Sequence, residues 1–251
     1  MINQLLMLLL LCPTGALVSD PILLREAGDA AFARIDYEEA RKAYESALGE
    51  FPSDAELLWR LARVYVCMGE VAEEPRRGEL FRKAEQYARA CVSSSPGQAE
   101  GHTWLAGSLG YIAYYSSTGR QVALVREILE ETNRALALDP GSDAAYSIRG
   151  STYRALGKVG WVERQFAALF LGSLPDGGFE EGEEALKKAI AIAPGIMRHW
   201  YELGVLYVDW GKKKEARAAL MEAQKLPVLV AIDRPRLEKT REYLRDLEGE
   251  R

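Results

Sequence analysis

The sequence has few of the residues that carry out chemistry in enzymes. It contains two histidines, His102 and His199, and three cysteines in 251 residues. Neither histidine has a Cys, Asp or Glu at the sequence spacing of a metal site or a catalytic pair, and no CxxC occurs. The run GKKKEA at 211–216 lacks the glycine pattern and the final Ser or Thr of a phosphate-binding loop. We therefore expect no enzymatic activity, no metal and no cofactor.

A surplus of positive charge is also lacking. The formal net charge is -5 and the pI is about 5.4, with both signs mixed among the 27% of charged residues. Without a broad basic surface, binding to the phosphate backbone of a nucleic acid is disfavoured. Hydrophobic residues make up 48% of the chain, which is long enough to bury a large core without metals or disulfides.

Residues 1–19 differ in character from the rest. Leu5 to Cys12 form an unbroken apolar run, and small residues and Pro13 follow it. This pattern predicts a signal peptide and a periplasmic or secreted protein, with a mature chain that starts near Leu17 or Asp20. An uncleaved membrane anchor is the alternative, because the first four residues contain no Lys or Arg. Leu11 stands where lipoprotein sites have a small residue, so lipidation of Cys12 is disfavoured.

The remaining cysteines, Cys67 and Cys91, lie within apolar helical patterns. We expect two buried free thiols, since free cysteine behaves as a small hydrophobic residue. A disulfide between them is the alternative in an oxidising compartment.

The organising feature of the chain is an internal repeat. Residues 21–54 carry small residues where two antiparallel helices would meet, larger ones between them, and a proline at the end: Leu24, Ala27, Gly28, Ala31, Ala40, Tyr44, Ala47 and Pro52. These are the signature positions of the tetratricopeptide repeat of about 34 residues. We predict an all-α tetratricopeptide-repeat superhelix, an α-α solenoid, with five repeats at 21–54, 55–98, 99–142, 143–196 and 197–230.

Three of the repeats contain extra residues, and a helix follows the last one. The second and third repeats have enlarged connections around 69–78 and 110–121. The fourth has an inserted amphipathic helix within 158–178, whose apolar positions are Trp161, Val162, Phe166, Leu169 and Phe170. Residues 233–249 predict a C-terminal capping helix, with Asp233 as its N-cap.

The apolar face of the inserted helix has two interpretations. It packs back against the solenoid, as apolar faces of soluble proteins usually do. Alternatively, Trp161, Phe166 and Phe170 form a docking surface for a partner or a membrane.

The chain also resembles a named family. The run DAELLWRLAR at 54–63, the insert WVERQFAALF at 161–170, and the segments FEEGEEALKKA and LGVLYVDWGKKKEA together resemble the regulator of microtubule dynamics family. The resemblance spans most of the chain from about residue 50. It implies a non-catalytic repeat protein linked to microtubules and, in some members, to organelle membranes. An exported chain would not meet cytoplasmic tubulin, so the predicted signal peptide argues against microtubules as its partner and favours a bacterial, exported relative.

In tetratricopeptide stacks the first helices of the pairs line a concave groove. Positions two, five, nine and twelve of these helices face the groove, and we predict that the partner-binding residues include Arg25, Trp59, Arg63, Ser147, Ser151, Arg154, Arg198 and Tyr201. Arginine and aromatic side chains together can anchor an extended peptide or an acidic segment. The sequence thus favours a scaffold or adaptor that binds a protein or peptide, with a membrane-associated tether as the alternative.

Overall fold

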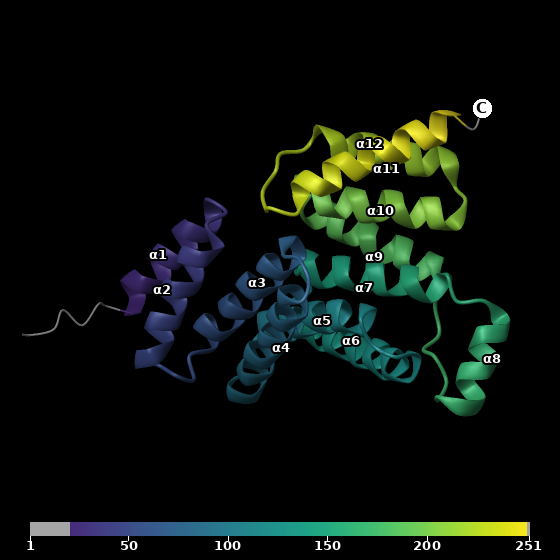
Figure 1. The fold of residues 1–251 in the computed structure, drawn as a ribbon. Helices are drawn as coiled ribbons and strands as arrows, with labels where there is room; N and C mark the ends of the chain where they lie inside the picture. The colour runs from purple at the N-terminus through teal and green to yellow at the C-terminus, as the bar shows by residue number, and fades with distance from the viewer. Residues whose placement is uncertain (1–20, 250–251) are drawn as a thin grey trace, which may run out of the picture.

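The computed structural model describes residues 21–249, and every regular element in that range is a helix (Figure 1). The predicted signal peptide or anchor at 1–19 lies outside the described residues. The helices are α1 (Pro21–Ala33), α2 (Tyr37–Glu50), α3 (Ala55–Val71), α4 (Arg76–Ser94), α5 (Ala99–Tyr114), α6 (Thr118–Leu138), α7 (Asp143–Gly157), α8 (Trp161–Phe170), α9 (Phe179–Ile192), α10 (Met197–Trp210), α11 (Lys213–Lys225) and α12 (Asp233–Gly249).

Ten of these helices form five antiparallel pairs. The pairs are α1 with α2, α3 with α4, α5 with α6, α7 with α9, and α10 with α11, and each pair packs against the next. The first helices also touch one another, since α3 contacts α5, α5 contacts α7, α7 contacts α10, and α10 contacts α12. We call the side of the stack formed by the first helices and α12 the inner face. This arrangement confirms the predicted all-α solenoid.

The repeat signature has a direct packing explanation. Gly28 of α1 lies against the ring of Tyr44 of α2, and both Ala40 and Ala47 are fully buried. In the fifth pair, a Cβ at Gly204 would lie 2.6 Å from Leu220 Cδ2, which is closer than real Cβ contacts. A larger residue at either glycine would force the two helices of a pair apart.

The extra residues of the second and third repeats extend helices. We expected enlarged connections around 69–78 and 110–121, but only four residues separate α3 from α4 and only three separate α5 from α6. The added residues contribute to the helices on either side, and α4 reaches 19 residues and α6 reaches 21.

The two helices outside the pairs are α8 and α12. α8 stands between α7 and α9 at one edge of the stack, within the range predicted for an inserted helix (Figure 1). α12 begins at Asp233, but that residue is not an ordinary N-cap. Its carboxylate accepts hydrogen bonds from the backbone N–H groups of Leu229 and Val230, which precede the helix.

No helix in the described range is both long enough and apolar enough to span a bilayer.

Candidate partner-binding face

The eight predicted partner-binding residues lie on the first helices of four pairs. Arg25 is on α1, Trp59 and Arg63 are on α3, Ser147, Ser151 and Arg154 are on α7, and Arg198 and Tyr201 are on α10. α5 contributes none, because its corresponding positions include Gly107 and Gly110. Five of the eight residues fall into two groups along the inner face, Trp59 and Arg63 in the first and Ser151, Arg154 and Arg198 in the second. In the part of the chain that the structure describes, no hydrogen bond or ion pair links Arg25 to the other seven.

The first group surrounds Trp59 and Arg63, and we call it the arginine–aromatic cluster: Asp29, Phe32, Trp59, Arg60 and Arg63. The Arg63 guanidinium carbon lies 3.8 Å from the centre of the Phe32 ring and 5.1 Å from that of Trp59. The Arg60 guanidinium carbon lies 4.3 Å from the Trp59 ring centre. Stacking of this kind orients a guanidinium while leaving its edge available for a carboxylate.

Asp29 is the anion of this cluster. Its carboxylate accepts hydrogen bonds from Arg60 Nε at 2.9 Å and from the Tyr44 hydroxyl at 2.7 Å, and Arg63 lies 3.7 Å away. Burial opposes its ionisation, but the hydrogen bonds from Tyr44 and Arg60 outweigh burial and lower the pKa of Asp29. One carboxylate therefore serves two arginines, and Arg63 is the more weakly paired of them.

The second group belongs to a network that we call the buried charge network: Glu70, Tyr111, Ser151, Arg154, Arg198, Glu202, Asp209, Asp233 and Arg236. At its centre, the Glu70 side chain is only 3% exposed. Its carboxylate accepts hydrogen bonds from the Tyr111 hydroxyl and, at 3.1 Å, from the Arg236 guanidinium. Arg198 lies 4.0 Å from the same oxygen. This centre brings together helices α3, α5, α10 and α12.

The second carboxylate of the network is Glu202. It accepts a hydrogen bond from the Ser151 hydroxyl at 3.0 Å and lies 3.6 Å from Arg154, which also pairs with Asp209 at 3.0 Å. Burial disfavours the charged form of Glu202, but Arg154, Arg198 and Arg236 outweigh burial and hold its pKa below the ordinary value. The predicted residues Ser151, Arg154 and Arg198 are therefore joined through acidic residues.

Several polar atoms on the inner face are buried without a partner. Five of the eight predicted residues carry such an atom: Trp59 Nε1, Arg63 Nε, Ser147 Oγ, Arg154 Nε and Arg198 Nε. Four of these five atoms are N–H donors that need an acceptor. A buried donor without an acceptor is costly.

Sequence reasoning missed the acidic and hydroxyl partners of these residues. Glu70 and Tyr111 lie beyond position twelve of their helices, and Glu70 looked like part of a charged connection. Arg236 is in the predicted capping helix, and nothing in the sequence of that helix marks it as buried. No local pattern marks this pair, since Glu70 and Arg236 are 166 residues apart in sequence.

α8 has its apolar side exposed. Trp161 is 74% exposed, Phe166 55% and Phe170 70%, whereas Ala167 is buried. The helix is held by Arg164, whose guanidinium donates to the carbonyl oxygens of Leu156 at 2.8 Å, Gly177 at 3.0 Å and Pro175 at 3.3 Å. Packing of this face against the solenoid was one of our two interpretations, and the structure does not show it. Docking of a partner or a membrane stays a prediction.

Both described cysteines lie in the helical core. Cys67 and Cys91 are free and buried, as expected. Burial raises the pKa of the Cys67 thiol to about 12 and that of Cys91 to about 11, so neither is a ready nucleophile.

Each histidine joins two helices through a carboxylate. His102 Nδ1 of α5 lies 2.5 Å from Glu131 Oε2 of α6, and His199 Nε2 of α10 lies 2.8 Å from Asp143 Oδ2 of α7. Sequence spacing did not reveal either pair. Among the described residues, no three His, Cys, Asp or Glu side chains come together as a metal site.

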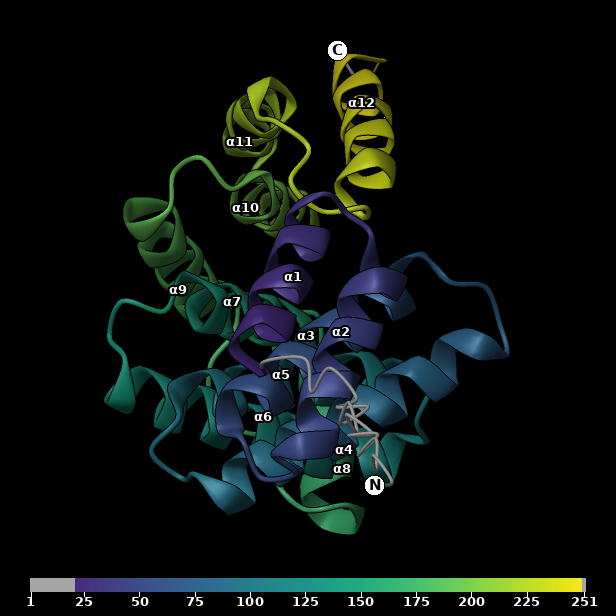
Figure 2. The ribbon, with the colours of Figure 1, turned by 90° about the vertical axis from the view of Figure 1, so that its left-hand side faces the viewer.

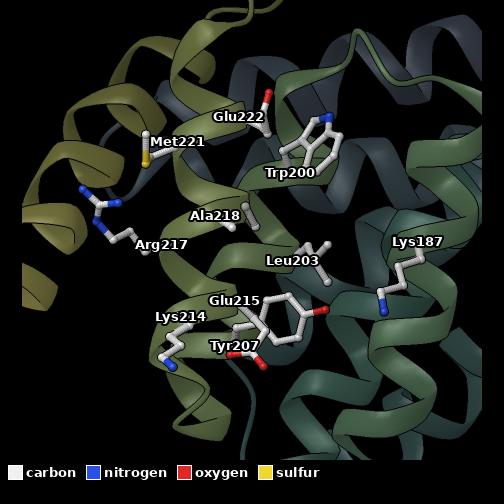
Figure 3. Close-up of a pocket in the computed structure, with 11 residues that line it drawn as sticks. Lys187, Trp200, Leu203, Tyr207, Lys214, Glu215, Arg217, Ala218, Met221 and Glu222 are labelled. Carbon is white, nitrogen blue, oxygen red and sulfur yellow. The ribbon is translucent and has the colours of Figure 1, made fainter.

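A cleft of about 710 Å³ lies on the other side of the stack, between α9, α10 and α11 (Figure 3). Trp200, Leu203 and Tyr207 of α10 form its floor, and Lys187 of α9 and Met221 of α11 stand on its two walls. Trp200 Nε1 donates to the carbonyl oxygen of Pro194, so this tryptophan is satisfied within the chain, unlike Trp59.

Comparison with known proteins places the chain among helical-repeat proteins. The family described as Regulator of microtubule dynamics protein 1-3 matches residues 24–248. The chain is 26% identical over 202 residues to Regulator of microtubule dynamics protein 3 of Xenopus laevis, an alignment that covers 78% of this chain and 44% of that protein. It is 24% identical to Regulator of microtubule dynamics protein 1 of Bos taurus, with 85% and 72% covered. The chain thus spans less than half of the first of these relatives.

Two solved structures share the fold. A thermophilic TPR protein of Thermus thermophilus superposes with a TM-score of 0.67 at 21% identity, covering 91% of this chain and 98% of that one. PilW, a type IV pilus biogenesis factor, superposes with a TM-score of 0.54 at 18% identity, covering 92% and 91%. At these identities the likeness establishes the fold alone.

Proposed function

The chain belongs to the regulator of microtubule dynamics protein 1-3 family, and we propose that it is a non-catalytic adaptor that binds an extended segment of a partner protein on its inner face. Its tetratricopeptide-like fold is that of a helical-repeat scaffold for protein interactions. The partner segment lies along α3, α7 and α10 and contacts the arginine–aromatic cluster, Arg154 and Arg198.

One observation carries this proposal. Trp59 Nε1, Arg63 Nε, Arg154 Nε and Arg198 Nε are buried donors without acceptors, and all four belong to residues that the repeat register assigns to the inner face. A polypeptide in extended conformation offers carbonyl oxygens along its length and carboxylates on its acidic side chains. These acceptors match the chemistry that the inner face lacks.

The test compares matched pairs of substitutions on the two faces of the stack. Trp59→Phe with Arg63→Gln removes two donors of the inner face and retains the aromatic ring. Trp200→Phe with Arg217→Gln makes the same chemical changes on the outer side of the stack. Immobilised wild-type chain and both variants are used to capture proteins from an extract of the source cells, and bound proteins are quantified by mass spectrometry.

We expect the inner-face variant to lose the partners that both the wild type and the outer-face variant recover. Equal recovery by all three chains contradicts the proposal. Circular dichroism on each variant establishes that a loss reflects the surface and not unfolding.

Microtubules are the second candidate partner, because the curated relatives are named as regulators of microtubule dynamics. Export through a cleaved signal peptide would separate the chain from tubulin, so the mass of the mature chain bears on this choice. A start near Leu17 or Asp20 supports an exported adaptor, whereas an intact Met1 supports an anchored tether. Co-sedimentation of the purified chain with microtubules assembled from pure tubulin tests the second candidate directly.

A further inference from the structure

The segment between α11 and α12 reaches back to the first helix pair. The backbone N–H of Ala231 donates to the Tyr37 hydroxyl of α2 at 2.9 Å, across 194 residues of sequence. Ala231 also packs against the apolar cluster built mainly from α2 and α3. Figure 2 looks onto α1 and α2, with the start of α12 above them. The loop before α12 is therefore in contact with the first helix pair.

A second contact lies one turn into α12. Arg236, with 8% of its side chain exposed, donates to the Glu70 carboxylate of α3. Asp233 stiffens the approach, because it accepts from the N–H groups of Leu229 and Val230 at 3.0 and 3.1 Å and pairs with Arg236 at 3.3 Å. We call residues 229–236 the clasp.

The clasp and α12 cover inner-face residues of α10. α12 packs against α10, and the charge of Arg236 acts on Arg198, Tyr201 and Glu202. Burial, together with Glu202 and the Tyr243 hydroxyl of α12, raises the pKa of Tyr201 to about 12. Two predicted partner-binding residues, Arg198 and Tyr201, thus lie beside a segment of the same chain.

The ion pair that holds the clasp can be replaced by an ion pair between the same arginines and a ligand. A buried ion pair loses hydration on both sides, so its net contribution to stability is small even though removal of one partner is costly. The clasp also leaves Arg198 Nε without an acceptor. A ligand that supplies a carboxylate to the arginines of the inner face would compete with the clasped arrangement.

We propose that the clasp is an autoinhibitory contact that holds the C-terminal segment against the first two helix pairs, and that an acidic partner segment binds the inner face by displacing it. The acidic partner rests on the proposed function, whereas the clasp itself does not. In the clasped chain, α12 occupies the place on α10 where the partner would bind. Release of α12 exposes Arg198 and Tyr201, which then form one binding surface together with Trp59 and Arg63.

Hydrogen–deuterium exchange on the full chain tests the clasp. Arg236→Gln removes the ion pair, and Tyr37→Phe removes the acceptor of the Ala231 N–H without any change of charge. Lys239→Gln is the matched control, since it removes one positive charge from α12 in an exposed pair with Glu242.

We expect both clasp variants, but not the control, to exchange faster at 229–236 and also at the α1–α2 turn. Faster exchange confined to α11 and α12 overturns the clasp and makes α12 an ordinary terminal cap. If Arg236→Gln lowers the overall melting temperature, Tyr37→Phe still decides the question.

Fluorescence anisotropy with a labelled hexaglutamate peptide tests the acidic partner. The apparent affinity of a gated site scales with the open fraction, so we expect both clasp variants to bind at least about threefold more tightly than wild type. Equal binding by wild type and both clasp variants overturns autoinhibition, and absence of binding to every chain overturns the acidic partner. Neither result depends on the capture experiment, which alone decides whether the inner face binds proteins.

Discussion

α8 and α12 are the two helices outside the five pairs, and they reverse the usual distribution of side chains in opposite ways. α8 exposes large apolar residues, including Leu169 at 77%, and the one residue that it buries is Ala167. α12 buries charged residues, Arg236 and Asp233. The apolar side of α8 is not covered by any other described helix of the chain, whereas the buried charges of α12 are paired with other residues of the chain.

The difference comes from how each helix is held. Arg164 fixes α8 through hydrogen bonds to three backbone carbonyl groups, so the orientation of α8 does not depend on its apolar side chains. α12 is held through side chains, because Arg236 pairs with the carboxylate of Glu70 on α3, in the second helix pair. Substitutions in α12 should therefore affect the whole fold, and substitutions on the apolar side of α8 should not.

The largest expected effect comes from Glu70→Ala. It removes the shared acceptor of Arg236 and Tyr111 and leaves a buried guanidinium without its anion. Loss of one partner of a buried ion pair costs about 3 kcal/mol or more. We expect a clear decrease in the urea midpoint, measured by circular dichroism at 222 nm. A midpoint within error of wild type would show that Glu70 is not the centre of the network.

Part of the fold and of the candidate site could be predicted from the sequence. The pairs were predictable, since Gly28, Ala40 and Gly204 are small for a local reason that repeats along the chain. The inner-face register was also accessible, and it led to five residues that carry unpartnered polar atoms.

The tertiary contacts of each helix surface could not be predicted. Hydrophobic periodicity located α8, but it reports which residues share a side and not whether another element covers that side. The Glu70–Arg236 pair depends on the path of the solenoid between two residues that are 166 positions apart, so no local sequence pattern could reveal it. The extra residues at 69–78 were predicted as an enlarged connection, but most of them belong to α3 and α4, because a charged segment can extend a helix as readily as it forms a loop.

A smaller effect is expected from acid. Burial opposes ionisation of Glu202, but Arg154, Arg198 and Arg236 lower its pKa below the ordinary value of 4.5. A carboxyl whose pKa is lower in the folded state stabilises the fold fully above the unfolded pKa, and this contribution is lost as the pH falls through the folded pKa. We expect α10 and α12 to lose stability below about pH 4.5, the region in which unfolded glutamate takes up its proton.

The same titration distinguishes the two helices, since α8 is held by an arginine and backbone carbonyl groups. Hydrogen exchange from pH 6 to pH 3, corrected for intrinsic rates, should show earlier loss of protection in α12 than in α8. The reverse order would mean that the buried charge network does not hold α12.

The smallest effect on stability is expected from Trp161→Ser combined with Phe170→Ser. Both side chains are mostly exposed, so their removal forfeits little buried area and should change the free energy of unfolding by about 0.5 kcal/mol or less. The change should instead appear in the surface of the folded chain, as weaker binding of a dye that reports exposed apolar groups. The matched change Leu203→Ser, in the buried core of α10, should destabilise strongly and serves as the control. A large loss of stability in the α8 variant would mean that its apolar side is covered within the chain, and the contrast with α12 would then disappear.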